Sequence, residues 1–292
     1  MKDIIVIVGP TGVGKTKLSV ELAKKINAEI INADSMQVYK RLNIGTAKVS
    51  EEEKQNVPHH LFDIVNPKDM YTVFDYQKDG RQKIKEILSK NKKVIIVGGT
   101  GLYIKALLYD YKFDIEKEKY DFSNFSNEEL YNKIMKIDNT NTVHINNRKR
   151  LERTLTKLLN NSFSKKEGNK KLYDFSLIGL TTDRENLYKI INKRVDVMVK
   201  NGLLEEVKEL YDEKINSKAI NTGIGYKELY KYFNNEITKE EAIDDIKQNS
   251  RRYAKRQYTF FNNQMDVKWF NTNYENFDKT IDEVLLYLET VH

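Results

Sequence analysis

Residues 4–16 read IIVIVGPTGVGKT, and this stretch indicates which fold to expect from the rest of the chain. Residues 4–8 are all β-branched and apolar, which predicts a strand buried on both faces of a sheet. Residues 9–16 match the phosphate-loop pattern G-x-x-x-x-G-K-[ST] at every fixed position. Apolar residues then recur at helical spacing, at Leu18, Leu22, Ala23 and Ile26. A strand, a glycine-rich loop and a helix in this order predict a site for a polyphosphate ligand.

The residue types in this loop suit phosphate binding. Its glycines allow successive backbone N–H groups to turn toward a phosphate, and the N-terminus of the following helix adds a partial positive charge. Lys15 supplies a full positive charge, and the Thr16 hydroxyl can coordinate Mg²⁺. The predicted phosphate-binding residues are Gly9, Pro10, Thr11, Gly12, Val13, Gly14, Lys15 and Thr16, with Thr16 as the metal ligand. The loop alone does not identify the polyphosphate.

Further apolar runs predict an α/β fold. Strand-like runs follow at residues 29–32, 93–97, 175–180 and 267–270. Helical patterns in the second half of the chain lie at residues 183–200, 202–213, 225–233, 239–262 and 279–290. Fully apolar strands that alternate with helices predict a parallel sheet covered by helices on both faces, as in the cores of P-loop NTPases.

Residues 111–171 follow a different pattern. Up to about residue 124 they are charged and aromatic without a clear period, and after that only helical patterns occur, interrupted by the polar stretch at residues 160–169. This predicts an all-helical insertion domain. The sheet domain is then split in sequence into residues 1–110 and 172–292.

Composition limits the possible classes of function. The chain has 292 residues and a net charge of +7, from 50 Lys and Arg against 43 Asp and Glu, so a nucleic-acid partner is permitted but not required. It has no cysteine, which excludes disulfides, thiolate zinc sites and a cysteine nucleophile. The first apolar run is too short for a signal sequence or a membrane span. We therefore expect a cytoplasmic protein with no membrane contact, and a monomer by default.

Polar residues follow two more of the predicted strands, at the edge of the sheet where the phosphate loop lies. Asp34 begins the segment Asp34-Ser35-Met36-Gln37, and Thr100 lies in Gly98-Gly99-Thr100-Gly101. In an open parallel sheet, ligands bind beyond the carboxyl ends of the strands. Asp34 is either a helix cap or turn former, or a general base or outer ligand of Mg²⁺. For Thr100 the alternative to a site residue is likewise a helix N-cap.

The histidines do not predict a metal site. His59 and His60 are adjacent and so point in different directions, and no pair of histidines has the i, i+4 spacing of helical ligands. We expect them to pack or to form hydrogen bonds.

Two basic clusters stand out, at residues 148–153 and 251–257. A charge run is more often a solvated helix face than a binding site, but two such runs in a phosphate-binding protein favour a polyanionic partner. At helical spacing Arg252 shares a face with Arg256, and Arg251 shares one with Lys255. The pattern leaves open which pair faces the phosphate site.

The motifs taken together resemble one family along essentially the whole chain. In order, they are GPTGVGKT, INADSMQVY, PHHLFDI, VGGTGLYIKALL, LTTDRENLYKIINKRVDVM, NGLLEEV, IGYKEL and RRYAKRQ. This set is similar to that of the bacterial tRNA dimethylallyltransferases, or IPP transferases. The resemblance implies transfer of a dimethylallyl group from dimethylallyl diphosphate to N6 of the adenine 3′ to the anticodon, position 37 of tRNA, with Mg²⁺ as cofactor. It also implies that the insertion helps to hold the tRNA anticodon stem-loop.

The resemblance further implies roles for individual residues. It makes Asp34 the general base, Thr100 a contact of the acceptor adenine, and Arg194 a diphosphate contact beside Lys15 and the rest of the loop. The implied catalytic residues are thus Asp34, Thr100 and Lys15. The implied tRNA-binding residues are Asp34, Ser35, Met36, Gln37, Thr100, Lys149, Arg150, Leu151, Glu152 and Arg153.

The sequence departs from the family pattern in two places. Residues 112–124 lack the usual prolines and basic helix, so we assign no tRNA contact there, and residues 145–148 read INNR where the family usually has Pro-Asn-Asp-Pro. Three alternatives remain: a small-molecule or nucleoside kinase with ATP in the same loop, a nucleotide-dependent RNA-binding switch, and an isopentenyltransferase acting on free adenine nucleotides.

Overall fold

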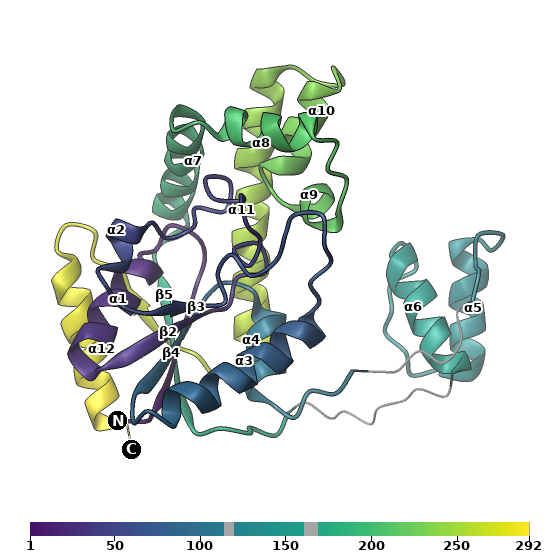
Figure 1. Ribbon diagram of the computed structural model, residues 1–292. Coiled ribbons are helices and arrows are strands. Elements are labelled where there is room, and N and C mark those ends of the chain that lie inside the picture. Colours follow the sequence, from purple (N-terminus) through teal and green to yellow (C-terminus); the bar gives the residue numbers. More distant parts are fainter. Residues whose placement is uncertain (114–119, 161–168, 292) are drawn as a thin grey trace. The chain divides into compact units, whose positions relative to one another are not determined.

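The computed structural model describes residues 1–113, 120–160 and 169–291. Within these ranges all strands belong to one parallel sheet of six, in the order β3-β2-β4-β1-β5-β6 (Figure 1). The predicted α/β class with a parallel sheet is confirmed. The strands are β1 (Ile4–Val8), β2 (Ala28–Asn32), β3 (His59–His60), β4 (Lys93–Val97), β5 (Phe175–Thr181) and β6 (Lys268–Asn271).

Strand β3 was not expected from the sequence, because it has only two residues and no apolar run. It forms because residues 59 and 60 pair in register with Ile30 and Ile31 at the edge of the sheet. The other strands lie where apolar runs predict them, since interior strands of a parallel sheet are buried on both faces.

The helix after the phosphate loop and most of the late helices lie close to their predicted positions, whereas the helices at residues 51–54, 73–88 and 218–222 were not predicted. In the first half of the chain they are α1 (Lys15–Ile26), α2 (Glu51–Lys54), α3 (Val73–Leu88), α4 (Gly101–Leu108), α5 (Asn127–Ile137) and α6 (Arg148–Leu159). In the second half they are α7 (Arg184–Lys200), α8 (Leu203–Asp212), α9 (Lys218–Thr222), α10 (Tyr226–Phe233), α11 (Lys239–Gln264) and α12 (Phe277–Thr290). No helix in the described ranges is long and apolar enough to cross a membrane.

Alternating strand residues divide the core between the two faces of the sheet. Ile5 and Ile7 of β1 belong to the cluster that contains Leu18 of α1 and Val284 of α12. The residue between them, Val6, is also fully buried but points to the opposite face. Helices α1 and α12 therefore cover one face, and α3 and α4 lie on the other side of the sheet (Figure 1).

A second apolar cluster joins the late helices to the chain that follows β2. Leu203 and Val207 of α8, together with Tyr226 of α10, pack against Val38 and Leu42, and all five side chains are fully buried. At about 25 cal/mol per Å² of buried apolar surface, such side chains contribute roughly 1.5 to 3 kcal/mol each. This cluster fixes the segment after residue 38 against α8 and α10.

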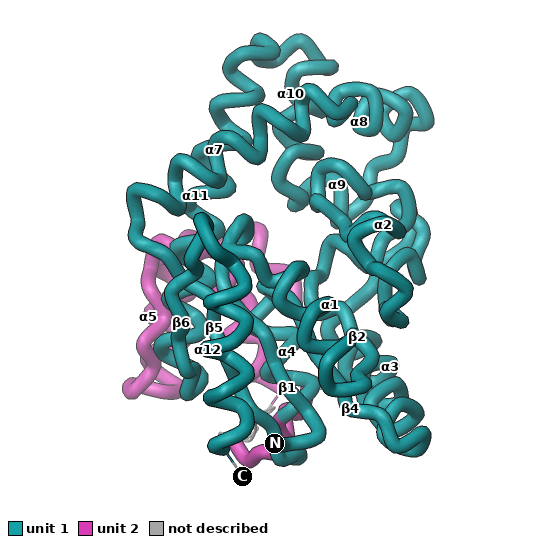
Figure 2. The backbone as a smooth tube through the Cα atoms, turned by 90° about the vertical axis from the view of Figure 1, so that its left-hand side faces the viewer, with its two compact units in different colours: residues 1–108, 172–292 teal, residues 109–171 magenta. Residues whose placement is uncertain are grey.

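The chain forms two compact units, residues 1–108 with 172–292, and residues 109–171 (Figure 2). In the smaller unit α5 and α6 pack through Leu130, Ile134, Leu151 and Leu155. The N-terminus of α5 carries a capping box between Ser126 and Glu129. Residues 114–119, within the segment where no tRNA contact was assigned, and residues 161–168, within the predicted polar interruption, lie outside the described residues.

Candidate active site

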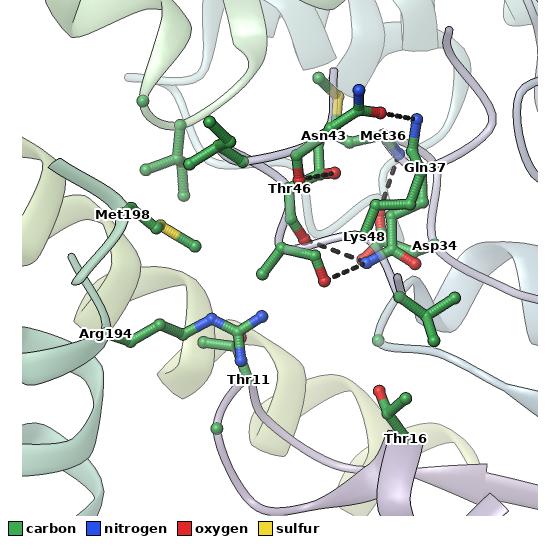
Figure 3. Close-up of a pocket in the computed structure, with 18 of the residues that line it drawn as sticks. Thr11, Thr16, Asp34, Met36, Gln37, Asn43, Thr46, Lys48, Arg194 and Met198 are labelled. Carbon is green, nitrogen blue, oxygen red and sulfur yellow. Dashed lines mark hydrogen bonds between the residues drawn. The ribbon is translucent and has the colours of Figure 1, made fainter. Parts of the chain in front are cut away.

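A cavity of about 1120 Å³ lies at the carboxyl ends of β1, β2 and β4, entirely within the larger unit. Its walls come from the phosphate loop, residues 34–37, residues 43–51, and helices α7 and α11 (Figure 3). This is the edge of the sheet where an open parallel fold binds its ligands.

The path of the phosphate loop depends on glycine. The backbone has positive φ at Gly9 (138°), Gly12 (87°) and Gly14 (89°), a region that side chains rarely adopt. A Cβ at Gly9 would also lie 2.5 Å from the carbonyl oxygen of Leu180. Helix α1 starts directly after Gly14, so its positive N-terminus faces the cavity.

Two cations from distant parts of the chain, Lys15 of the loop and Arg194 of α7, lie partly buried at this site. Lys15 donates a hydrogen bond to the carbonyl oxygen of Pro10 at 2.6 Å. Burial lowers the pKa of Lys15 to about 7, with the positive charge of Arg194 acting in the same direction and Asp34 opposing it. Burial likewise lowers the pKa of Arg194, which Asp34 again opposes.

Arg194 extends from α7 into the cavity that Thr11 and Thr16 line (Figure 3). Its Nε is buried and has no hydrogen-bond partner among the described residues. A buried, unpaired donor costs about 1 to 3 kcal/mol or more. The site thus holds two desolvated cations that an anion would stabilise.

The loop residues do not all face the cavity. Thr11, Gly12, Gly14, Lys15 and Thr16 line it. Gly9, Pro10 and Val13 are outside the lining, although Pro10 holds Lys15 through its carbonyl group and Val13 accepts a hydrogen bond from Thr272 at 2.9 Å.

Asp34 both forms a turn and lines the cavity. Its Oδ1 accepts a hydrogen bond from the Met36 N–H at 2.8 Å, and its own N–H donates to Asn32 Oδ1 at 2.9 Å. Among the residues that the structure describes, Asp34 Oδ2 has no hydrogen-bond partner. The turn therefore uses one carboxylate oxygen and leaves the other to a ligand.

Thr100 connects the ends of β4 and β2. Its hydroxyl accepts a hydrogen bond from the Ser35 N–H at 3.0 Å and donates to Ser35 Oγ at 3.3 Å. It lies just before α4 and accepts from the Tyr103 N–H through its carbonyl oxygen. The hydroxyl thus bonds to the Asp34 segment and not to the helix N-terminus, and Thr100 itself is not in the cavity lining.

Helix α11 contributes residues that were not assigned to the site from the sequence. Tyr253, Arg256 and Gln257 line the cavity. Gln257 is buried and donates to the Gly99 carbonyl oxygen at 3.0 Å, and its buried Oε1 has no partner in the part of the chain that the structure describes. Burial raises the pKa of Tyr253, whose hydroxyl also interacts with Thr100. The motif RRYAKRQ contains all three residues, and their shared helical face was the available signal.

Of the basic residues on α11, only some face the site. Arg256 lines the cavity. Arg251 instead donates to Asn192 Oδ1 at 2.6 Å, while Arg252 and Lys255 are exposed outside the lining.

Residues 43–51 form one side of the cavity, which was not predicted from the sequence. Gln37 donates through Nε2 to the carbonyl oxygens of Thr46 (3.0 Å) and Ala47 (3.3 Å). Lys48 donates to the Tyr39 carbonyl oxygen and to Asp63. Most of this wall is irregular in structure, so no periodicity marks it.

His59 and His60 form hydrogen bonds, as predicted. His59 Nδ1 lies 2.7 Å from the Val57 carbonyl oxygen, and His60 Nε2 lies 2.7 Å from Glu29 Oε2. Within the described ranges no group of three His, Cys, Asp or Glu side chains could hold a metal ion.

The basic cluster of the smaller unit lies on α6 and divides by exposure. Lys149, Arg150 and Arg153 are exposed, whereas Leu151 is fully buried in the helical core. Glu152 is paired with Arg148, which also donates to the carbonyl oxygens of Phe122 and Phe125.

Comparisons with known proteins agree with this architecture. A model of the IPP transferase family matches residues 37–264. The tRNA dimethylallyltransferase of Anoxybacillus flavithermus is 46% identical over 302 residues, which cover 99% of this chain and 96% of that protein.

Solved structures of proteins with these activities are also similar to this chain. The tRNA isopentenylpyrophosphate transferase of Bacillus halodurans superposes with a TM-score of 0.79 at 41% identity, covering 99% of this chain and 96% of that one. A eukaryotic dimethylallyltransferase, solved acting on tRNA, gives a TM-score of 0.80 at 27% identity and covers 99% and 79%. The chain therefore belongs to the IPP transferase family, a family of tRNA-modifying prenyltransferases.

Proposed function

We propose that this chain transfers the dimethylallyl group of dimethylallyl diphosphate to N6 of the adenine 3′ to the anticodon, position 37 of tRNA, and releases diphosphate. The observation that carries this proposal is the convergence of Lys15, Arg194 and Asp34 on one cavity. Two partly buried cations suit a leaving diphosphate, and the Asp34 oxygen that has no partner among the described residues suits proton removal.

The donor half of the reaction depends on stabilising the leaving group. As the bond between C1 and oxygen breaks, negative charge grows on the diphosphate. The loop N–H groups, Lys15 and Arg194 are already in place to receive it, so little reorganisation is needed. Removal of one such donor typically costs about 10² to 10³ in rate.

Mg²⁺ is the proposed cofactor, and the Thr16 hydroxyl is the residue proposed to hold it. Thr16 lines the cavity at the N-terminus of α1. Mg²⁺ usually binds through one or two protein oxygens and the substrate phosphates, which fits a site without a preformed carboxylate cluster. When bound, the ion would neutralise charge on the leaving diphosphate.

The acceptor half depends on residues 34–37 and Thr100, which we call the acceptor wall. An adenine amine is a weak nucleophile, and a carboxylate is too weak a base to deprotonate it at rest. As N6 begins to bond to C1, its protons become acidic, and Asp34 can then accept one. Thr100 would contact the adenine, and Ser35, Met36 and Gln37 would contact the neighbouring nucleotides.

The smaller unit is proposed to hold the anticodon stem-loop through the exposed Lys149, Arg150 and Arg153, with Leu151 and Glu152 on the same helix. Phosphate contacts of this kind give affinity without sequence specificity. The adenine must leave its stack to enter a cavity, which costs least at an unpaired loop position. We further propose that the protein acts as a monomer in the cytoplasm.

Incubation of the protein with unmodified tRNA, Mg²⁺ and labelled dimethylallyl diphosphate tests the proposal. Label is expected at adenine 37, and none on a matched tRNA with guanine at that position, which lacks the N6 amine. Inorganic diphosphate should compete with the donor, and ATP should not be hydrolysed. Stoichiometric release of inorganic phosphate from ATP would favour a kinase, and label on free adenine nucleotides would favour a transferase that needs no tRNA.

A further inference from the structure

The carboxylate of Glu206 on α8 binds three consecutive backbone N–H groups of the cavity wall. Its Oε2 accepts from the N–H groups of Asn43 (2.9 Å) and Ile44 (2.7 Å), and its Oε1 accepts from that of Gly45 (3.0 Å). Oε1 also accepts the Tyr226 hydroxyl at 2.7 Å. Hydrogen bonds to an ionised acceptor are about twice as strong as neutral ones, so this one side chain fixes the start of the wall.

Tyr226 limits the same segment from a second side. Its ring is fully buried, and a Cβ added at Gly45 would lie 2.8 Å from it. The backbone of the wall therefore packs directly on the ring while Glu206 holds its N–H groups. Together, these contacts hold the backbone of residues 43–45 in one position against α8 and α10.

The residues that follow this fixed segment contact the acceptor wall. The carbonyl oxygens of Thr46 and Ala47 are the acceptors for the Gln37 side-chain amide. Asn43 also accepts from Lys48 at 2.8 Å through its side chain. These residues lie together at one side of the cavity, away from Thr11 and Thr16 (Figure 3). A shift of residues 43–47 would thus displace Gln37 without touching the phosphate loop.

We infer that Glu206 is a positioning residue for tRNA: through residues 43–47 it sets the orientation of Gln37 in the acceptor wall. The inference rests on the proposed function, because it takes Gln37 as a tRNA contact. It assigns Glu206 no contact with substrate and no part in diphosphate binding.

The test is Glu206→Gln, with Glu205→Gln as the matched control. The amide can accept on one oxygen only, so two of the four donors lose their acceptor. Glu205 is the preceding residue on α8 and is exposed, so its variant makes the same charge change without touching the wall. Steady-state transfer at varied tRNA, with saturating donor, gives KM and kcat separately. Titration with inorganic diphosphate gives the affinity of the donor half.

For Glu206→Gln we expect KM for tRNA to rise about tenfold, as the loss of two hydrogen bonds to a charged acceptor predicts. The kcat and the diphosphate affinity should stay within about twofold of wild type, and Glu206→Asp should recover part of the KM. A wild-type KM in Glu206→Gln would overturn the inference alone. So would a joint loss of diphosphate affinity and thermal stability, which marks a merely structural role. Absence of transfer by the wild-type protein would overturn the proposed function and this inference with it.

A second variant covers the case in which Glu206→Gln does not fold. Gly45→Ala pushes the wall away from Tyr226 while leaving Glu206 intact. The same rise in KM without loss of diphosphate affinity is expected, and an unchanged KM would again overturn the inference.

Discussion

The phosphate loop and residues 34–37 of the acceptor wall contribute to one cavity but are held in place in opposite ways. The loop is set by neighbours in sequence: glycines with positive φ, and Lys15 bound to Pro10 within the loop itself. The acceptor wall is set by distant neighbours, since the Ser35 N–H binds Thr100 Oγ1 across 65 residues. The phosphate loop therefore presents backbone groups that local conformation holds in place. The acceptor wall instead presents side chains that contacts between distant segments hold in place. Variants in the two regions should separate the donor step from the acceptor step.

The largest effect is expected for Asp34→Asn in the acceptor wall. Asn keeps the oxygen that accepts from the Met36 N–H, so the turn should persist, but the basic oxygen is lost. Loss of a general base typically lowers the rate by about 10² to 10⁴. The measurement is single-turnover transfer at saturating substrates across a series of Mg²⁺ concentrations.

Two results would remove Asp34 from the role of base. One is a loss of rate below about tenfold, which a turn former would give because Asn serves as well as Asp. The other is recovery with excess Mg²⁺, which would mark a metal ligand. Asp174→Asn is a suitable control, because that exposed carboxylate pairs with Lys2 and such surface pairs contribute about 0 to 1 kcal/mol.

The next largest effect is expected in the phosphate loop, for Lys15→Met. Removal of this partly buried cation should lower the rate by about 10² to 10³ and weaken diphosphate binding, while tRNA affinity stays at the wild-type value. Lys25→Met, at the far end of the same helix and exposed, should change neither quantity. If Lys15→Met lost tRNA affinity as well, the separation of the two regions would be wrong.

The same contrast explains what the sequence could predict. Gly9–Thr16 encode their own conformation, so the loop and the edge of the sheet that carries it could be derived from residue types and spacing. Asp34 and Thr100 could be proposed because they follow buried strands, whose carboxyl ends meet at one edge of a parallel sheet.

The position of residues 43–51 and the hydrogen bonds of Glu206 to residues 43–45 could not be predicted in this way. Both involve hydrogen bonds between segments more than 160 residues apart, and an irregular segment carries no period that would reveal them. Gln257 is an intermediate case, since its helix could be predicted but not its bond to the Gly99 carbonyl oxygen.

A smaller effect is expected for Gly99→Ala, which disturbs the acceptor wall indirectly. A Cβ there would lie 1.9 Å from Gln257 Nε2, so this buried amide must move. Overpacking of this kind usually costs about 1 to 3 kcal/mol, and we expect a loss of about tenfold in kcat/KM for tRNA. The double variant Gly99→Ala with Gln257→Ala removes the clash and should be more active than the single one. Equal activities of the single and double variants would mean that the clash with Gln257 does not cause the loss of activity.

The smallest effect on the rate at saturation is expected for the combined alanine substitution of Lys149, Arg150 and Arg153. These side chains are exposed on the smaller unit, so the chemistry in the cavity should be untouched and kcat should remain at the wild-type value. Affinity for tRNA should fall, and its dependence on salt should weaken. Each lost phosphate contact reduces the slope of log affinity against log salt by roughly 0.7 to 0.9.

The control removes the same charge from the larger unit, at the ends of helices that lie away from the cavity. Lys25, Lys85 and Lys90 are exposed near the ends of α1 and α3 that lie away from the cavity. Their triple alanine variant lowers the net charge equally, so it reports the general electrostatic contribution to tRNA binding. A slope that falls by the same amount in both triple variants would mean that residues 149–153 are a solvated helix face. A fall of about two or more confined to the α6 variant would identify this helix as a phosphate-contacting surface, and would extend the acceptor side of the comparison beyond the cavity itself.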